Sequence, residues 1–347
     1  MEKVRIDLNE NSYDILIGTN ISNDLNVLID KGSEHNFIIT DKNVDRLYGS
    51  SLDTFGGYDK IVIEPGEDSK SIHVVTDILE QMLNKGASRK SKVIAFGGGV
   101  VGDLAGFCSA IYMRGISFIQ VPTTLLSQID SSVGGKTGIN LLHCKNSVGA
   151  FHQPDKVIID IRFLHTLPSR ELLSGIGEII KYGIIYDYKF LKYIIENIDE
   201  IKKCNDEIML YVVKRCCEIK AEIVSQDEKE KGLRKILNFG HTIGHALEGI
   251  TGFSKYTHGE AVIIGMYHET IMARRLGLID EKYAEEILSF LEDLNINLDI
   301  GGYPDSELHR WMLKDKKNIE GKVSFILPVR EGQVSEVLLD EDEIFLK

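Results

Sequence analysis

Three histidines and two glutamates occur at spacings that could bind a metal ion. A helix would present His241, His245 and Glu248 on one face, because they lie four and three residues apart. His258 follows thirteen residues after His245, and Glu178 lies upstream in a helical pattern. Zinc binds imidazole nitrogens and carboxylate oxygens, and a catalytic zinc commonly has three protein ligands and one open position. The sequence therefore predicts a site with three ligands drawn from Glu178, His241, His245 and His258.

Other readings of the histidine pair remain open at this point. The motif His-Thr-Ile-Gly-His lacks the glutamate that follows the first histidine in zinc proteases, so that activity has no general base here. Two histidines one turn apart also occur on helices that bind nothing. The nearby His-Gly-Glu at His258, and the glycines Gly240 and Gly244, favour a ligand pair, because small residues allow a second helix or a substrate to come close.

A glycine-rich turn follows an apolar stretch in the first half of the chain. Gly97, Gly99 and Gly102 form the pattern G-x-G-x-x-G, which lets a pyrophosphate approach the backbone at the start of a helix. The alternative is a tight strand-to-helix turn without a ligand. A dinucleotide site usually has an acid at the end of the next strand, but that strand ends at Pro122, and a strand-end acid, Asp41, occurs earlier. We expect a nucleotide site with a non-standard chain order.

A second segment, from Pro122 to Pro154, is also rich in glycine and polar residues. Lys136 follows two glycines, as phosphate-binding lysines do, and Lys145 and Asn146 come shortly after it. The segment is not a Walker A loop, because Asp130 stands where that motif has its first glycine. We interpret it as a loop that binds an anion.

The pattern of elements divides the chain into two parts. Short apolar stretches alternate with helical ones in the first part, which is typical of a parallel sheet with crossover helices. The second part is helical nearly throughout and ends in a pair of alternating stretches. We predict an α/β, Rossmann-like nucleotide-binding domain over residues 1–166 and a mainly α-helical, metal-binding domain over residues 167–347. The expected strands are 15–17, 37–40, 61–63, 93–96, 118–121, 157–161, 322–329 and 333–339, and the expected helices are 20–31, 71–84, 171–182, 190–198, 206–224, 242–250, 260–276 and 282–294.

Composition excludes several classes of protein. The net charge of −13 argues against a nucleic-acid-binding surface, so any anion site must gather its Lys and Arg locally. Five cysteines without a CxxC pair indicate reduced thiols rather than a disulfide framework. The beginning of the sequence lacks the pattern of a signal peptide, and the most apolar stretch, residues 95–113, contains five glycines and Asp103. We expect a cytoplasmic protein that binds neither membranes nor nucleic acid.

Several long motifs together resemble the 3-dehydroquinate synthase family. The resemblance runs from about Pro65 to Pro328, and its motifs are GGGVVGDLAGF, QVPTTLLSQIDSSVGGKTGIN, KNSVGAFHQP, TLPSRELLSGIGEIIKYG, SQDEKEKGLRKILNFGHTIGHALE, HGEAV and DKKNIEGKVSFILP. The sequence departs from the family pattern at three places: Pro65 directly precedes Gly66, where the family more often has one residue between them, Cys144 stands where Gly is usual, and Gly177 stands where Ala is usual.

The resemblance implies a homodimeric enzyme with NAD and one catalytic Zn²⁺ or Co²⁺. By motif, the metal ligands would be Glu178, His241 and His258, which leaves His245 for substrate binding or proton transfer. The catalytic residues would be Asp130, Lys136, Lys181 and His245. The substrate-binding residues would be Arg114, which can reach the neighbouring subunit, Asn146, Lys220, Arg234, Asn238 and Lys317. The residues that contact NAD would be Asp41, Asn43, Pro65, Gly66, Glu67, Asp68, Ser69, Lys70, Gly99, Val100, Val101, Gly102, Asp103, Thr123, Thr124, Lys136, Lys145, Phe163, Leu164, His165 and Thr166.

The implied reaction belongs to the shikimate pathway. It converts 3-deoxy-D-arabino-heptulosonate 7-phosphate to 3-dehydroquinate and phosphate, by alcohol oxidation, β-elimination of phosphate, ketone reduction, ring opening and aldol closure. Lys220 and Arg234 suit the substrate carboxylate, and Lys136, Asn146 and His245 suit its phosphate. The alternatives are a related sugar-phosphate cyclase, a metal-dependent polyol dehydrogenase and a nucleotide-binding module without catalysis.

Overall fold

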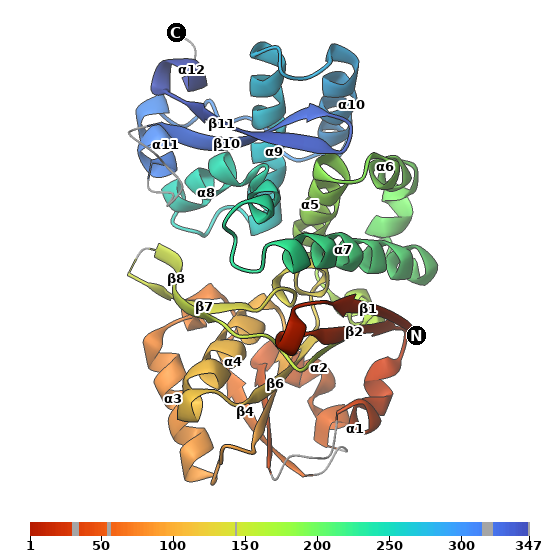
Figure 1. Cartoon of the computed structure of the whole chain (residues 1–347), viewed down its shortest axis with the longest axis vertical. Helices are drawn as coiled ribbons and strands as arrows, with labels where there is room; N and C mark the ends of the chain where they lie inside the picture. The colour runs from red at the N-terminus through yellow and green to blue at the C-terminus, as the bar shows by residue number, and fades with distance from the viewer. Residues whose placement is uncertain (30–34, 54–56, 143, 314–321, 346–347) are drawn as a thin grey trace. The chain divides into compact units, whose positions relative to one another are not determined.

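The computed structural model describes residues 1–29, 35–53, 57–142, 144–313 and 322–345. The chain divides into two compact units (Figure 1). Unit 1 comprises Met1–Leu167 and Cys204–Lys229, and unit 2 comprises Pro168–Lys203 and Glu230–Lys347. The first break falls one residue after the predicted boundary at 166. The chain then returns to unit 1 for one helix, α7 (Asp206–Gln226), which the sequence pattern had grouped with the second part.

Unit 1 is built on a seven-stranded sheet with the order β1-β2-β9-β6-β5-β3-β4. The pairs from β2 to β4 are parallel, as predicted, and β1 is antiparallel to β2. The sequence pattern missed β1. The strands are β1 (Glu2–Ile6), β2 (Tyr13–Gly18), β3 (Asn36–Asp41), β4 (Tyr58–Ile63), β5 (Lys92–Gly97), β6 (Ser117–Pro122) and β9 (Lys156–Asp160).

Two apolar clusters cover the two faces of this sheet, because successive side chains of a strand point to opposite sides. Phe37 and Val93 belong to one cluster, and Ile38 and Ile94 belong to the other. The first cluster includes side chains of α3 and α4, and the second includes side chains of α1 and α2. These helices are α1 (Leu25–Leu28), α2 (Lys42–Asp53), α3 (Ile72–Asn84) and α4 (Gly99–Ile111).

The segment interpreted as an anion-binding loop is largely a β-hairpin. β7 (Lys136–Leu141) pairs antiparallel with β8 (Cys144–Phe151). The glycines that suggested a loop allow the two backbones to approach, because a Cβ on Gly149 would lie 2.1 Å from the carbonyl oxygen of Thr137. A glycine-rich strand has no apolar alternation, so the sequence pattern could not reveal it.

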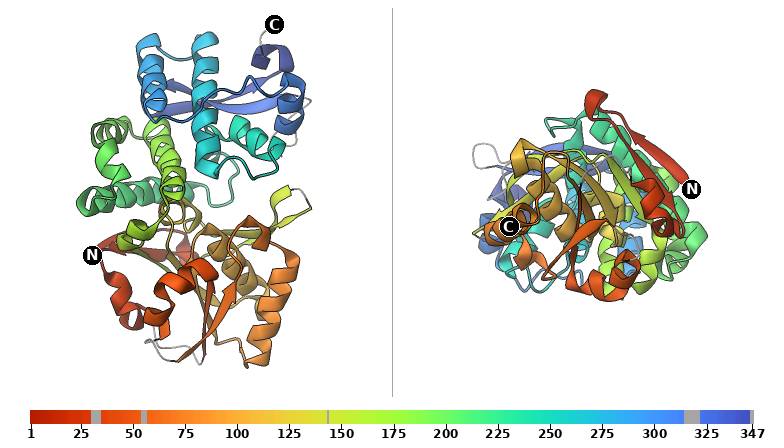
Figure 2. Two further views of the ribbon diagram at one scale, coloured as in Figure 1. Left: turned by 180° about the vertical axis from the view of Figure 1, so that it is seen from behind. Right: turned by 90° about the horizontal axis from the view of Figure 1, so that it is seen from below.

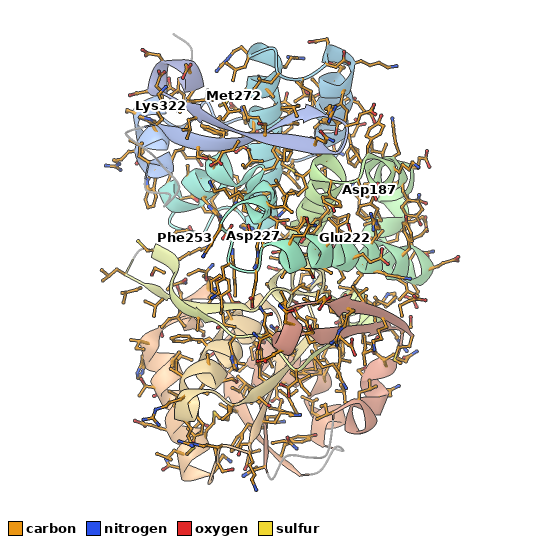
Figure 3. The ribbon with its side chains drawn as sticks, in the orientation of Figure 1. Asp187, Glu222, Asp227, Phe253, Met272 and Lys322 are labelled. Carbon is orange, nitrogen blue, oxygen red and sulfur yellow. The ribbon has the colours of Figure 1, made fainter. Side chains whose placement is uncertain are left out.

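Unit 2 is mainly helical, as predicted, with a two-stranded antiparallel ribbon. The ribbon packs against the long helix α9, on which Met272 lies (Figure 2 and Figure 3). The helices are α5 (Ser169–Ile185), α6 (Tyr188–Lys202), α8 (His241–Ile250), α9 (His258–Arg275), α10 (Glu281–Glu292), α11 (Asp305–Met312) and α12 (Glu341–Phe345), and the strands are β10 (Val323–Arg330) and β11 (Gln333–Leu339). Among the described residues, no helix is both long and apolar enough to cross a membrane.

Candidate metal centre and nucleotide-binding turn

Three helices of unit 2 bring a carboxylate and two imidazoles together. Glu178 lies on α5, and His241 and His258 are the first residues of α8 and α9. One ligand atom from each of these residues lies within 4.8 Å of those of the other two. The Nε2 atoms of His241 and His258 are 3.6 Å and 3.7 Å from the same Glu178 oxygen, Oε1. These three residues are the ligand set that the family resemblance implied.

The Glu178 carboxylate gives a physical test of whether a cation suits this place. Its side chain is fully buried, and Oε1 accepts no hydrogen bond from any residue that the structure describes. The other oxygen, Oε2, accepts a hydrogen bond from Lys181, which is also buried. A buried carboxylate oxygen that accepts no hydrogen bond is costly, and a cation bound between Oε1 and the two imidazoles would remove that cost. The donor set, one carboxylate and two imidazoles, is of the type that zinc binds.

Both imidazoles are oriented by acceptors at their Nδ1 atoms. His241 Nδ1 lies 3.0 Å from the carbonyl oxygen of Phe239, and His258 Nδ1 lies 3.4 Å from Oε2 of Glu248. A proton on each Nδ1 leaves Nε2 as the ligand atom on the side of Glu178. Burial, followed by the charge of Lys181, lowers the pKa of His241 well below its ordinary value. His241 is therefore neutral near pH 7, as a metal ligand must be.

Glycines allow the helices that carry these ligands to cross closely. A Cβ on Gly259, next to His258, would lie 1.9 Å from the carbonyl oxygen of Ser174 on α5. A Cβ on Gly265 of α9 would lie 1.9 Å from the carbonyl oxygen of Gly240, which precedes α8. Neither distance is compatible with a side chain, so both crossings require glycine. The crossings set the spacing between the three candidate ligands.

Glu269 supports this arrangement, although no motif in the sequence indicated it. It is fully buried on α9, and its carboxylate accepts hydrogen bonds from Gly240 N at 2.6 Å and Ile243 N at 3.3 Å. It thereby satisfies backbone donors at the beginning of α8, the turn that carries His241. A charged residue within an otherwise apolar stretch of α9 is the signal that could have identified it.

The role of His245 stays a prediction. Its ring centroid lies 5.3 Å from that of His241 and 6.0 Å from that of His258, so it borders the cluster. It also forms a second group of possible ligands with Glu248 and His258. The residue type and spacing alone therefore do not separate a ligand from a substrate-binding residue.

The glycine-rich turn of unit 1 connects β5 with α4. A Cβ on Gly98 would lie 2.9 Å from Thr124, and one on Gly102 would lie 2.7 Å from Gln120 of β6, so α4 packs closely on the strand below it. β5 is paired with β6 on one side and β3 on the other. The chain connections leave these two strands in opposite directions, which is where open α/β sheets bind nucleotides. β3, which pairs with β5, ends at Asp41. The strand-end acid therefore comes from a strand that precedes the glycine-rich turn in the chain, which explains the unusual chain order.

Lys70 is the centre of a polar cluster beside this turn. Its side chain is 4% exposed, and Nζ lies 2.6 Å from Asp103 Oδ2 and 3.7 Å from Glu67 Oε1. Nζ also donates a hydrogen bond to Oδ1 of Asn146. Burial alone would lower the pKa of Lys70, but Asp103 and Glu67 outweigh it and raise that pKa. The Lys70 ammonium is therefore positive. Through Lys70, residues predicted to contact NAD lie beside Asn146, which was predicted to contact the substrate.

The other predicted residues of unit 1 lie on several separate elements. Lys220 of α7 is buried and donates from Nζ to the carbonyl oxygen of Asp130 at 2.6 Å and to its Oδ1 at 2.7 Å. His165 Nε2 lies 2.6 Å from Asp206 Oδ1 at the beginning of α7. The remaining predicted positions are in short 3₁₀ helices, in turns, or in the first or last residues of longer elements: Asn43, Pro65, Gly66, Asp68, Ser69, Gly99, Val100, Val101, Arg114, Thr123, Thr124, Lys136, Lys145, Phe163, Leu164 and Thr166.

The remaining predicted substrate residues belong to unit 2. Arg234 and Asn238 lie on the short 3₁₀ helix Leu233–Asn238. Arg234 is 2% exposed, and Asn238 Nδ2 donates to Glu230 Oε1 at 3.3 Å. Lys317 lies outside the described residues.

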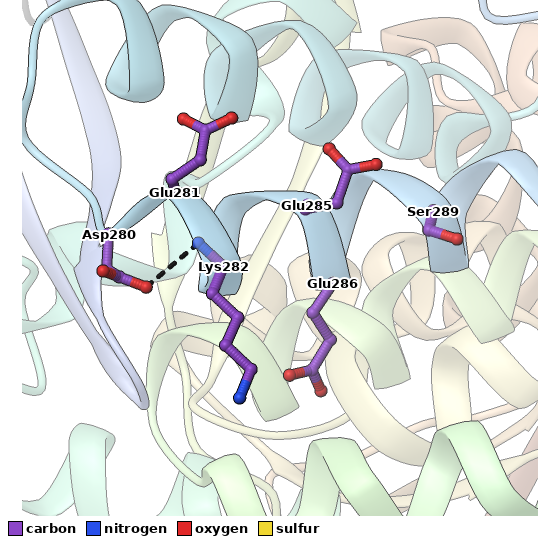
Figure 4. Close-up of a pocket in the computed structure, with 6 residues that line it drawn as sticks. All are labelled: Asp280, Glu281, Lys282, Glu285, Glu286 and Ser289. Atoms are coloured by element: carbon purple, nitrogen blue, oxygen red, sulfur yellow. Dashed lines mark hydrogen bonds between the residues drawn. The ribbon is translucent and has the colours of Figure 1, made fainter.

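A surface hollow along α10 has no part in the predicted site. It is lined by Asp280, Glu281, Lys282, Glu285, Glu286 and Ser289 (Figure 4). Three of its four carboxylates have cationic partners: Lys192 lies 2.5 Å from Glu286, and Arg274 lies 3.5 Å from both Glu281 and Glu285. It is a solvated acidic helix face.

Comparison with known proteins identifies relatives over nearly the whole chain. The family described as 3-dehydroquinate synthase N-terminal matches residues 60–174, and the family described as 3-dehydroquinate synthase C-terminal matches residues 175–318. The chain is 53% identical over 347 residues to the 3-dehydroquinate synthase of Alkaliphilus metalliredigens (strain QYMF), covering 99% of this chain and 97% of the relative.

Two solved structures have the same fold. One is ValA, a 2-epi-5-epi-valiolone synthase from Streptomyces hygroscopicus subsp. jinggangensis 5008 with NAD⁺ and Zn²⁺ bound. It is 27% identical, with a TM-score of 0.89 over 97% of this chain and 96% of that one. The other is a 2-deoxy-scyllo-inosose synthase complexed with carbaglucose-6-phosphate, NAD⁺ and Co²⁺. It is 24% identical, with a TM-score of 0.90 over 99% of this chain and 98% of that one. At this identity the similarity shows a shared fold alone.

Proposed function

The chain belongs to the 3-dehydroquinate synthase family, and we propose that it performs the reaction of that family. It is an NAD- and divalent-metal-dependent lyase that converts 3-deoxy-D-arabino-heptulosonate 7-phosphate to 3-dehydroquinate and phosphate. The observation that carries the proposal is the convergence of Glu178, His241 and His258, with a buried carboxylate oxygen that lacks a hydrogen-bond partner among the described residues. A nucleotide-binding module without catalysis has no need of such a cluster.

The bound groups supply the chemistry that amino-acid side chains lack. Zinc or cobalt held by Glu178, His241 and His258 would polarise a substrate alcohol and lower its pKa, and NAD at the turn after β5 would take up hydride and return it. Because the hydride returns, the reaction has no net consumption of NAD.

The chain's own residues bind the substrate and control its charges. Arg234 is buried and offers a planar fork of donors for a carboxylate, and Lys220 adds a positive charge. Asn146, Lys136 and His245 are assigned to the phosphate. Their convergence on one substrate is part of the proposal, since Lys220 and Arg234 belong to different units.

Lys181 acts on Glu178. Its Nζ donates to Oε2, which holds the carboxylate with Oε1 directed to the two imidazoles. The ammonium also disfavours protonation of His241, as the lowered pKa of that residue reflects. Lys181 thus orients the Glu178 carboxylate and helps to keep His241 neutral.

A phosphate-release assay tests the proposed function. With the heptulosonate 7-phosphate as substrate, we expect release of inorganic phosphate without accumulation of NADH, and loss of turnover after treatment with a chelator. Accumulation of NADH without phosphate would instead indicate a polyol dehydrogenase. His258→Ala should fold and lose both bound metal and turnover, whereas His73→Ala, which changes an exposed histidine of α3, should retain both. Full activity of His258→Ala would contradict the ligand assignment.

The substrate carboxylate separates this function from that of related cyclases. If Arg234 forms a buried ion pair with the substrate, Arg234→Ala should lower kcat/KM, with a loss of about 2–5 kcal/mol of transition-state stabilisation. The measurement is steady-state kinetics with the carboxylate-bearing substrate. Unchanged kinetics would remove Arg234 from the site and would favour a substrate without a carboxylate.

The family membership also leads us to propose a cytoplasmic homodimer. In support, Ile111 and Met113 expose apolar side chains beside Arg114, the residue expected to reach a neighbouring subunit. Light scattering on the purified protein would give the mass of a dimer. A monomer at all concentrations would contradict this assignment.

A further inference from the structure

We propose that Asn140 is a positioning residue that ties the turn at Glu67–Lys70 to Asn146. The inference rests on the proposed function, because that function assigns the turn to NAD and Asn146 to the substrate. Neither the sequence motifs nor the family resemblance assigned a role to Asn140. Its importance follows from three hydrogen bonds in unit 1 that join three separate segments of the chain.

The first observation is the set of contacts that Asn140 makes. Its side-chain Nδ2 donates to Glu67 Oε1 at 2.9 Å, and its Oδ1 accepts from the backbone N–H of Asn146 at 2.8 Å. Its own backbone N–H donates to the carbonyl oxygen of Lys70 at 2.8 Å. Lys70 in turn donates from Nζ to the side chain of Asn146. Asn140, Lys70 and Asn146 therefore form a closed ring of hydrogen bonds, to which Glu67 is joined.

The second observation is an irregularity in the hairpin at this point. Ile139 pairs with Val148 and Leu141 pairs with Cys144, so Asn140 alone faces residues 145–147 of β8. This bulge contains Lys145 and Asn146, both predicted binding residues. A bulge leaves backbone groups outside the strand ladder and directs side chains to new positions.

Asn146 shows why this bulge needs an external partner. Its φ is +50°, a left-handed conformation that a residue other than glycine adopts at a cost. The Oδ1 of Asn140 holds the N–H of Asn146 in that conformation. The same amide group, through Nδ2, holds the Glu67 carboxylate. One side chain thus fixes a predicted cofactor contact with its donor and a predicted substrate contact with its acceptor.

These two functions of one amide can be separated by substitution. Asn140→Ala removes both hydrogen bonds, and we expect NAD⁺ affinity to fall and the KM for the heptulosonate 7-phosphate to rise, each about fivefold, with kcat nearly unchanged. Asn140→Asp keeps an acceptor for Asn146 but replaces the donor to Glu67 by a second carboxylate. We expect it to restore the KM to within about twofold of the wild type while NAD⁺ binding stays weakened at least fivefold.

The matched control is Ser147→Ala, which removes an exposed hydroxyl from the same bulge without touching the ring. NAD⁺ affinity is measured by calorimetric titration, kinetics by phosphate release, and folding by the thermal unfolding temperature of each variant without ligand. Wild-type constants in Asn140→Ala would overturn the inference, as would equal effects of the Ala and Asp variants on both constants. If Asn140→Ala fails to fold, the split between KM and NAD⁺ affinity in Asn140→Asp decides. A wild-type protein that neither binds NAD⁺ nor releases phosphate would instead refute the proposed function.

Discussion

Replacing Gly259 by alanine tests whether the α5–α9 crossing builds the metal centre. The new Cβ would lie 1.9 Å from the Ser174 carbonyl oxygen, whereas real Cβ contacts essentially never fall below 3.0 Å. The two helices must therefore separate by about 1.1 Å along this contact. Metal–ligand distances tolerate only about 0.2 Å. Since His258 is the neighbour of Gly259, it would move away from Glu178, and we expect zinc affinity to fall about 100-fold.

Two further glycines of unit 2 offer control substitutions with smaller steric clashes. A Cβ on Gly177 would lie 2.8 Å from the carbonyl oxygen of Gly259, which requires a shift of only about 0.2 Å, and a Cβ on Gly302 would meet nothing within 4 Å. Gly302→Ala should therefore bind zinc like the wild type, and Gly177→Ala should lose less than about tenfold. The small effect expected at Gly177 agrees with its position as a departure from the family pattern, which usually has alanine there.

The assay is zinc competition with a chromophoric chelator, accompanied by urea unfolding of the metal-free proteins. Overpacking of this kind typically costs about 1–3 kcal/mol, less than the stability of an ordinary domain, so the Gly259→Ala protein should remain folded. A folded Gly259→Ala protein with wild-type zinc affinity would refute the claim that this crossing sets the ligand spacing.

Three other predictions concern single side chains. Glu248→Gln should weaken zinc binding about 10–100-fold, because it removes the carboxylate from His258 Nδ1, and chelator competition measures this; an unchanged affinity would show that the 3.4 Å contact does not orient the ring. His241 has a lowered pKa when folded and an ordinary value of about 6.5 when unfolded, so the unfolded chain binds more protons and the metal-free protein should lose stability as pH falls below about 6.5. Urea unfolding between about pH 5 and pH 7 should show a smaller pH dependence in His241→Gln, and an equal dependence would exclude this cause. Iodoacetamide should label one thiol per native chain, Cys144, because the other four are buried, and mass spectrometry that finds several adducts would contradict that burial.

The sequence predicted the α/β first part and the helical second part, because apolar periodicity reports which faces of an element are buried. It could not choose among His241, His245 and His258 by spacing, since a ligand set depends on where helices cross. The crossing contacts join Ser174 to Gly259 and Gly240 to Gly265. The members of each pair are far apart in the chain, and glycine has no side chain whose pattern could reveal the contact. Only the family resemblance separated His245 from the ligands.

Other features depended on contacts that no local pattern records. The hairpin β7–β8 was concealed because Gly138 and Gly149 lack the side chains that would reveal a strand. Asn140 was overlooked because its type is common in turns, and its three partners lie in segments up to 73 residues away.

The return of α7 to unit 1 has a consequence for how this protein is made and divided. β1 packs against α7, and Lys214 of that helix lies 2.6 Å from Glu2. β1 therefore lacks one of its packing partners until the residues beyond 204 have been synthesised. A fragment that stops at Leu167 would lack α7. An autonomous unit 1 would therefore have to include residues 204–229, with a linker between Leu167 and Cys204 in place of α5 and α6.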